Sequence, residues 1–268
     1  KPFDVLPEVT VKMSDEVYFF NTDKQKEIEI IVKAGKDNIE GFVSMCYPND
    51  WNIYPEKQKL ILNKKGEEQK MVFTVIPPKN DSEGLISPMV DINGNIYSKE
   101  LFEIDYSHIP FQNVVLNSES KVVRLDINKK GTNIAYIVGA GDSVPESLQQ
   151  IGYNVVTINP EDISSGTLSN FDAVVIGIRA YNVIDELQNK QEILFDFVEQ
   201  GGNMIVQYNT SRRLLVDNLA PYILKLSRDR VTDENAEVRL LDPEHEVLNY
   251  PNKITSKDFE GWTQERGL

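Results

Sequence analysis

Four short apolar segments decide the fold of the second half of this chain: IAYIVG (134–139), NVVTI (154–158), AVVIGI (173–178) and NMIVQ (203–207). Each is apolar at nearly every position, which is typical of strands that are covered on both faces of a parallel sheet. Helical patterns at 144–152 and 185–200 lie between them. Strands that alternate with helices predict a doubly wound parallel sheet, with any site at the loops that follow the strands.

Beyond residue 213 the pattern weakens. We expect a short helix at 214–219 and strands at 222–226 and 238–241. At the start of the unit, Ser143 and Glu146 have the spacing of a capping box, and Pro145 suits the first helical turn. The predicted α/β domain covers residues 133–268.

Residues 1–112 carry a different pattern, in which short alternating strands are separated by turns rich in Asn, Asp, Gly and Pro. Asn93-Gly94 is the strongest hairpin signal. About seven strands at this spacing predict an immunoglobulin-like β-sandwich. The predicted strands include 9–11, 17–20, 27–32, 41–46, 59–62, 70–76 and 101–104.

Three residues of this half invite a functional reading. Trp51 suits a carbohydrate-stacking platform, but we expect it to fill the end of the sandwich. We expect Cys46 to be a small buried hydrophobe and His108 to be packed between the domains. Residues 113–132 are predicted to be a linker with edge strands of its own.

Composition excludes several classes of function. A net charge of −14 and a pI near 4.7 disfavour nucleic acid and anionic membrane surfaces as partners. No apolar run is long enough to span a bilayer. The single cysteine cannot form an internal disulfide, and the two histidines, His108 and His245, lack acidic or Cys neighbours at ligand spacing, so we expect no metal or other cofactor in this chain.

Because the chain opens with Lys1-Pro2-Phe3 and no initiator Met, we expect it to be part of a longer protein.

The first strand-to-helix loop begins a dinucleotide fingerprint. Gly139-Ala140-Gly141 supplies the first two glycines of G-x-G-x-x-G, but Val144 stands at the third. Asp142 also places a carboxylate at the helix N-terminus, where a pyrophosphate would need positive charge. The sequence therefore favours a tight turn over a nucleotide site.

The last strand is followed by Tyr208-Asn209-Thr210 and not by a Ser or Cys nucleophile in a G-x-S-x-G setting. Thr210 or Ser211 could serve a stand-alone hydrolase, with His245 the only histidine that follows in sequence. A complete catalytic triad is not visible, but this alternative stays open.

Polar residues of unusual composition follow the strands, and they converge on one edge if the sheet is parallel. Arginines, amides and tyrosines at a concave edge suit a carboxylate, a phosphate or sugar hydroxyls. The alternative is an internal network of such groups that holds an interface together, as in a purely structural or oligomerisation module. The candidate ligand-binding residues are Arg179, Tyr181, Asn182, Gln207, Tyr208, Asn209, Arg228 and Arg230, beside Arg212 and Arg213.

A family resemblance rests on several segments. IAYIVGAGD (134–142), FDAVVIGIRAYN (171–182) and FVEQGGNMIVQYNTS (197–211) resemble the C-terminal region of large bacterial PIG-L-type (LmbE-like) deacetylases, especially those of Bacteroidetes. YSHIPFQ (106–112), LSRDRVTDENAEV (226–238) and FEGWTQERGL (259–268) add to the resemblance. In that family a zinc-dependent N-deacetylase domain, acting on N-acetylglucosamine-type sugars, precedes an Ig-like module and a domain resembling class I glutamine amidotransferases.

The resemblance implies that this chain is the non-catalytic, accessory part of such a protein. The HPDDE-type zinc motif of the family does not occur in the sequence, so zinc is expected only in the preceding domain. The amidotransferase-like domain also lacks a cysteine at Tyr208-Asn209-Thr210. The implied partners are the deacetylase domain and a glycan, and the implied location is the periplasm or cell surface.

Overall fold

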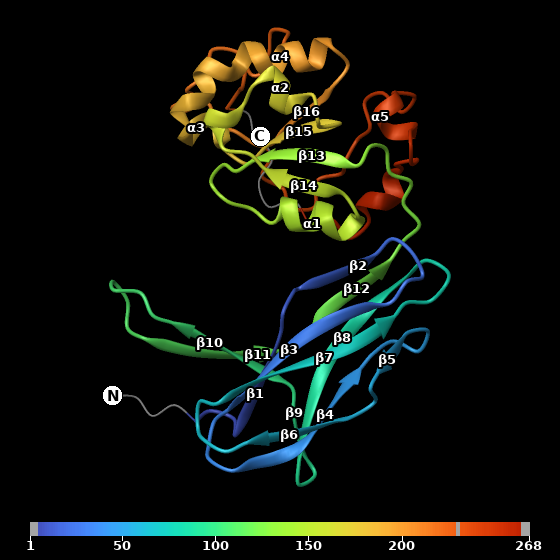
Figure 1. The fold of residues 1–268 in the computed structure, drawn as a ribbon, viewed down its shortest axis with the longest axis vertical. Helices are drawn as coiled ribbons and strands as arrows, with labels where there is room; N and C mark the ends of the chain where they lie inside the picture. The colour runs from blue at the N-terminus through green and yellow to red at the C-terminus, as the bar shows by residue number, and fades with distance from the viewer. Residues whose placement is uncertain (1–4, 229–230, 264–268) are drawn as a thin grey trace. The chain divides into compact units, whose positions relative to one another are not determined.

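The computed structural model describes residues 5–228 and 231–263, which form two compact units, Lys1–Asp126 and Ile127–Leu268. The fold is mixed: antiparallel sheets dominate the first unit, and the second has a parallel sheet with a few helices (Figure 1). Two strands from the segment 113–132, predicted as a linker, belong to the first unit.

Two sheets and a hairpin make up the first unit. One sheet has the order β1 (Val9–Met13), β3 (Lys26–Ala34), β7 (Glu68–Ile76) and β5 (Asn52–Tyr54). The other has the order β2 (Val17–Phe20), β12 (Ser120–Arg124), β8 (Ser82–Ile92), β4 (Ile39–Cys46) and β6 (Gln58–Leu62), with β9 (Asn95–Tyr97) beside β8. The separate hairpin pairs β10 (Lys99–Ile104) with β11 (Gln112–Asn117).

Alternation along the strands builds one core between the two sheets. In β3 and β4 every second side chain is buried, as the two-residue period of a strand requires. Asn93 and Gly94 both have positive φ and link β8 to β9, so the predicted hairpin is confirmed. Each of the seven strands listed for residues 1–112 lies within an observed strand.

Three single-residue expectations for this unit can be compared with the structure. Trp51 is fully buried, with its ring edge-on to Phe20 and its Nε1 donating to Ser82 Oγ at 3.1 Å, so it belongs to the core as expected. The prediction for Cys46 was wrong: it falls on the outward phase of β4 and is exposed. Within the first unit the ring of His108 is exposed and lies beside Tyr106 in the β10–β11 loop, and its packing between the domains stays a prediction.

The second unit is organised by a four-stranded parallel sheet in the order β14-β13-β15-β16. Its strands are β13 (Asn133–Ile137), β14 (Asn154–Thr157), β15 (Ala173–Ile176) and β16 (Asn203–Val206), each at a predicted segment. The helices are α1 (Val144–Ile151), α2 (Ser165–Leu168), α3 (Ala180–Val183), α4 (Gln191–Glu199) and α5 (Glu246–Asn249), and the 3₁₀ turns are η1 (Pro160–Asp162), η2 (Asp185–Lys190) and η3 (Ser256–Phe259).

Both faces of this sheet are covered. On one face Ile137 and Ile176 share a cluster with Leu194 of α4, and on the other Tyr136 packs with Leu148 of α1. Figure 1 shows α1 on the side of the sheet opposite to α2, α3 and α4. Burial on both faces explains why these strands are apolar throughout.

The start of α1 differs from the sequence prediction. Ser143 makes no side-chain capping bond, so the predicted capping box does not form. Asp142 takes over this role, because its Oδ1 accepts from the N–H of Val144 at 2.9 Å. Pro145 does lie in the first turn, as predicted.

After β16 the described chain contains no further strand, so the strands predicted at 222–226 and 238–241 were wrong, as was the helix predicted at 214–219. Val216 and Leu219 pack on the sheet from an irregular segment, while Ile223 and Leu241 are about nine-tenths exposed. A strand needs a partner for its backbone groups, and these short apolar runs do not pair with β16.

The described helices include none with the length and apolarity needed to cross a membrane. Within residues 5–228 and 231–263, no three His, Cys, Asp or Glu side chains are grouped as metal ligands.

Candidate functional site

A carboxylate ties three strand ends together at the carboxyl edge of the parallel sheet. The Tyr136 hydroxyl, from the end of β13, donates to Asp142 at 2.6 Å from Oδ1. Gln207, just beyond β16, donates from Nε2 to the Tyr136 hydroxyl at 2.8 Å. The N–H of Ile178, after β15, reaches Asp142 Oδ2 at 3.3 Å.

These bonds set the ionisation of the pair. Partial burial acts to raise the pKa of Asp142, but donors from Tyr136, Val144 and Ile178 together outweigh it and hold the pKa below its usual value. Burial, and then the hydrogen bond to Asp142, raises the pKa of Tyr136 well above that of a free phenol. Asp142 is thus an anion already seated at the start of α1, where a bound pyrophosphate would have to lie.

The turn from β15 into α3 is tight and holds its residues under strain. Arg179 adopts a left-handed conformation, with φ 56° and ψ 18°, which is uncommon for a residue with a side chain. Its N–H donates to Tyr208 O at 2.7 Å, and the carbonyl of the preceding Ile178 accepts from Ala140 at 2.8 Å. At Gly139 a Cβ would lie 2.0 Å from that carbonyl oxygen, so only glycine fits there.

This strand–turn–helix form is the one in which α/β hydrolases hold a nucleophile. The sequence predicts that turn after β16, at Tyr208-Asn209-Thr210, whereas the strained residue follows β15 and is Arg179. A guanidinium is not a nucleophile but is an excellent donor to anions. The Thr210 hydroxyl, the alternative nucleophile, donates to Arg212 O at 3.0 Å.

Two asparagines shape the loop that follows β16. The Asn182 amide nitrogen donates to Thr210 O at 2.9 Å and to Arg212 O at 3.1 Å, while its oxygen accepts from the Thr210 N–H at 2.8 Å. Asn209 is buried, accepts from the N–H of Tyr181 at 3.1 Å and donates to Gln207 O at 2.8 Å. Both side-chain amides bond to backbone groups, so Asn182 and Asn209 are positioning residues for the 207–213 loop.

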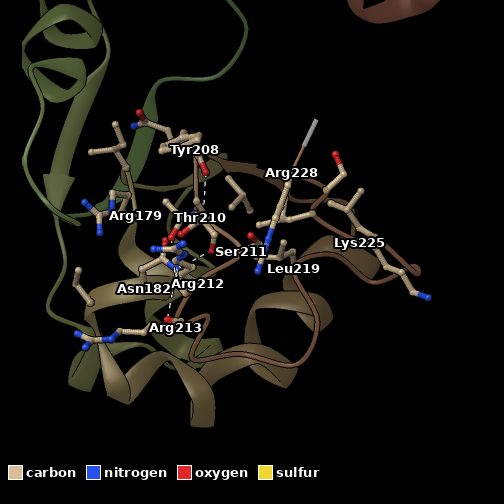
Figure 2. A pocket seen from close by; sticks show the side chains of 18 of the residues that line it. Arg179, Asn182, Tyr208, Thr210, Ser211, Arg212, Arg213, Leu219, Lys225 and Arg228 are labelled. Carbon is tan, nitrogen blue, oxygen red and sulfur yellow. Dashed lines mark hydrogen bonds between the residues drawn. The ribbon is translucent and has the colours of Figure 1, made fainter. Parts of the chain in front are cut away.

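This loop forms one wall of a broad, open pocket of about 2260 Å³ (Figure 2). The remaining walls come from the β15–α3 turn, from residues 219–228 and from Trp262 and Thr263. The described residues that line it are Ile178, Arg179, Asn182, Val183, Val206, Gln207, Tyr208, Asn209, Thr210, Ser211, Arg212, Arg213, Leu219, Leu224, Lys225, Leu226, Ser227, Arg228, Trp262 and Thr263.

The lining is positively charged in an acidic protein. Five of its residues are cations, and no Asp or Glu occurs among the described residues of the wall. These cations are Arg179, Arg212, Arg213, Lys225 and Arg228. Every ion pair found within the described ranges belongs to the first unit, so none of the five has a carboxylate partner there.

The structure brings most of the candidate ligand-binding residues together. Six of the eight line the pocket: Arg179, Asn182, Gln207, Tyr208, Asn209 and Arg228. Among these, Arg179 and Arg228 are exposed and Tyr208 is 43% exposed. Arg230 lies outside the described residues.

Tyr181 lies away from the pocket wall, because the α3 turn directs it into the core, where its side chain is fully buried. Burial raises the pKa of Tyr181 to about 12, against a smaller opposing effect of the nearby Gln191 amide. Gln191 donates to Asn218 O, and the phenol has no hydrogen-bond partner among the described residues. The prediction that Tyr181 contacts a ligand does not fit this position.

Lys225 and Trp262 also line the pocket, although neither was among the predicted site residues. Both come from segments without regular structure, so the rule that directs attention to strand ends could not find them. Trp262 is 61% exposed, and its ring packs beside Phe259.

Comparisons with known proteins find no matching family model and no matching curated protein. Among solved structures, the chain is similar to a family 123 glycoside hydrolase from Clostridium perfringens, with 6% identity, a TM-score of 0.28 and coverage of 62% of this chain and 38% of that one. The sporulation control protein Spo0M from Bacillus subtilis gives 12% identity, a TM-score of 0.24 and coverage of 44% and 50%. A protein of unknown function from Porphyromonas gingivalis gives 9% identity, a TM-score of 0.27 and coverage of 50% of this chain and 61% of that one.

The chain spans less than two thirds of the length of each of these structures. Their identities and TM-scores are too low to carry an argument about fold or function.

Proposed function

We propose that this chain is a non-catalytic accessory region that binds a glycan in the pocket of its second unit. Its parent would be a PIG-L-type, zinc-dependent N-acetylglucosamine deacetylase of the periplasm or cell surface. The sequence segments at 134–142, 171–182 and 197–211 support that parentage through their resemblance to the family. The observation that carries the binding role is the open pocket, whose arginines form no ion pair with any residue that the structure describes.

Within this proposal the two units have different tasks. The first is an Ig-like sandwich that serves as a spacer, which its two sheets around one core support. The second is a doubly wound, amidotransferase-like domain, which the strand order and the helices on both faces support. Ligands of such sheets bind beyond the carboxyl ends of the strands, where this pocket lies.

A role in binding rather than hydrolysis is favoured by what occupies the two turns. Arg179 stands at the strained turn after β15, and the hydroxyl of Thr210 is directed to a backbone carbonyl. His245 accepts a hydrogen bond from Val247 at the start of α5 and is not one of the described lining residues.

The proposal is tested by calorimetric titration of the full chain with a panel of neutral and acidic oligosaccharides. We expect at least one class to bind, and we expect Arg179→Asn to weaken that binding because the guanidinium is lost. Asparagine is chosen because it tolerates the left-handed conformation of this position. Arg239→Asn is the matched control, because Arg239 is an exposed arginine of the same unit outside the pocket. Failure of every glycan to bind, or equal effects of the two variants, would contradict the proposal.

A second candidate function is an oligomerisation module, because large apolar side chains are exposed after β16. Tyr222 is 69% exposed, Ile223 89% and Leu241 94%. Light scattering across a range of protein concentrations tests it: a mass that rises with concentration, and falls back in Ile223→Ser, would favour association through this segment.

A further inference from the structure

The cations of the pocket have no partner within the described protein, although the chain as a whole carries 42 acidic and 28 basic side chains. In such a chain a random group of five charges would contain carboxylates. We propose that the pocket takes an acidic oligosaccharide, meaning one whose sugar units carry carboxylate or sulfate groups. This inference rests on the proposed glycan-binding function and names its ligand class.

The type of cation favours oxyanions of this kind. Four of the five are arginines, whose planar guanidinium groups donate two parallel hydrogen bonds to a carboxylate or sulfate. The backbone of Arg179 is held by its strained turn and by the bond from its N–H to Tyr208 O at 2.7 Å, so its exposed side chain starts from a fixed point of the pocket wall.

The size of the pocket favours an oligomer over a single sugar. Sites for small molecules commonly enclose about 300–1,000 Å³. This pocket has about 2260 Å³, and its cations come from three separate stretches of chain: the β15–α3 turn, the 207–213 loop and residues 219–228. A ligand that meets all of them must carry negative groups on several linked units.

Aromatic side chains on the walls favour a sugar over another polyanion. Tyr208 is 43% exposed and Trp262 is 61% exposed, and both residues line the pocket. Such rings offer large apolar contact at small entropic cost, which suits the C–H faces of a pyranose. An acidic peptide or another polyanion would use the cations but has less use for the rings.

The test compares a pair of ligands that share the same sugars and differ only at the carboxylate. Tetragalacturonate carries a carboxylate on each sugar, and its methyl ester has the same sugars without the charge. We expect the acid to bind the full chain and the ester to bind at least about tenfold more weakly, since each charged hydrogen bond contributes roughly 1.5–3 kcal/mol. A carrageenan-derived tetrasaccharide, which carries sulfate groups but no carboxylate, distinguishes sulfate from carboxylate, and either acid supports the inference.

Variants then locate the binding. Arg179→Asn and Arg228→Gln should each lower the affinity for tetragalacturonate about tenfold, while the control Arg239→Asn leaves this affinity unchanged. Melting temperatures and circular dichroism confirm that each variant is folded. Unchanged affinity in both pocket variants would overturn the inference.

The remaining outcomes separate this inference from the proposed function. One outcome is that neutral chitotetraose alone binds. Another is that it binds as tightly as the acids and that Arg179→Asn lowers its affinity. In either case the proposed glycan-binding function stands and the proposed acidic ligand class is wrong. If polyglutamate binds as tightly as tetragalacturonate, the pocket recognises charge and not sugar, and the inference fails. If no oligosaccharide binds at all, both fail together.

Discussion

At the scale of single residues, Asp142 joins separate parts of the second unit at the carboxyl edge of the parallel sheet. It accepts from Tyr136, Val144 and Ile178, which lie on separate elements of the second unit. A buried donor that loses its acceptor costs about 1–3 kcal/mol. We therefore expect Asp142→Asn to lower the stability of the second unit by about that amount, as measured by urea unfolding.

The same residue predicts a dependence of stability on pH. Because the pKa of Asp142 is lower in the folded chain, its contribution is complete above the unfolded carboxyl value of about 3.9 and is lost as the pH falls through the folded value. Thermal melting between pH 7 and pH 2 should show this loss in the wild type and a shallower one in Asp142→Asn. Parallel curves for the two proteins would contradict the assignment.

Arg179 gives a second prediction at this scale. A left-handed conformation costs a residue with a Cβ about 1–2 kcal/mol, and glycine avoids this cost but loses about 0.5–1 kcal/mol through its greater freedom when unfolded. We expect Arg179→Gly to be more stable than Arg179→Ala by roughly 1 kcal/mol, although both lose the guanidinium. Equal unfolding midpoints would show that the turn is not strained.

At the scale of elements, the 207–213 loop depends on Asn182, which bonds to Thr210 and Arg212 from a neighbouring helix. We expect Asn182→Ala to weaken glycan binding without removing a ligand contact, because the loop that carries Tyr208 and the arginines is released. Hydrogen exchange reports this directly: the Thr210 amide should exchange faster in the variant. Unchanged exchange at Thr210 would leave Asn182 without a positioning role.

Some elements of the fold could be predicted from the sequence and others could not. The parallel strands were predictable because burial on both faces leaves a continuous apolar run, as in Ala173–Ile176. The hairpin at Asn93-Gly94 was predictable because its backbone conformation selects those residues. The segment after β16 was not, because apolar residues such as Leu219 pack there without any periodic pattern.

The candidate site was also predictable only in part. Strand-end residues such as Arg179, Gln207 and Tyr208 were found because parallel strands end at a common edge. The opposite orientation of Tyr181, inward and not toward the pocket, follows from a turn geometry that sequence does not reveal. Lys225 and Trp262 reach the pocket from irregular chain, which no local rule anticipates.

At the scale of the whole molecule, each unit has its own hydrophobic core. Phe73 is fully buried in the core of the first unit, and truncation of such a residue costs about 3–5 kcal/mol. We expect Phe73→Ala to lower the unfolding midpoint of the first unit and to leave the affinity for glycan unchanged. A parallel loss of affinity would mean that the two units do not act separately.

The central claim is that a glycan occupies the pocket beside Trp262, and fluorescence quenching tests it most directly. The chain has two tryptophans: Trp51 is fully buried, whereas Trp262 is 61% exposed. Acrylamide should therefore quench mainly Trp262, and saturating tetragalacturonate should protect it, an effect that disappears in Trp262→Phe. If the ligand binds by calorimetry while quenching of Trp262 stays unchanged, the glycan lies elsewhere and the account of this pocket is wrong.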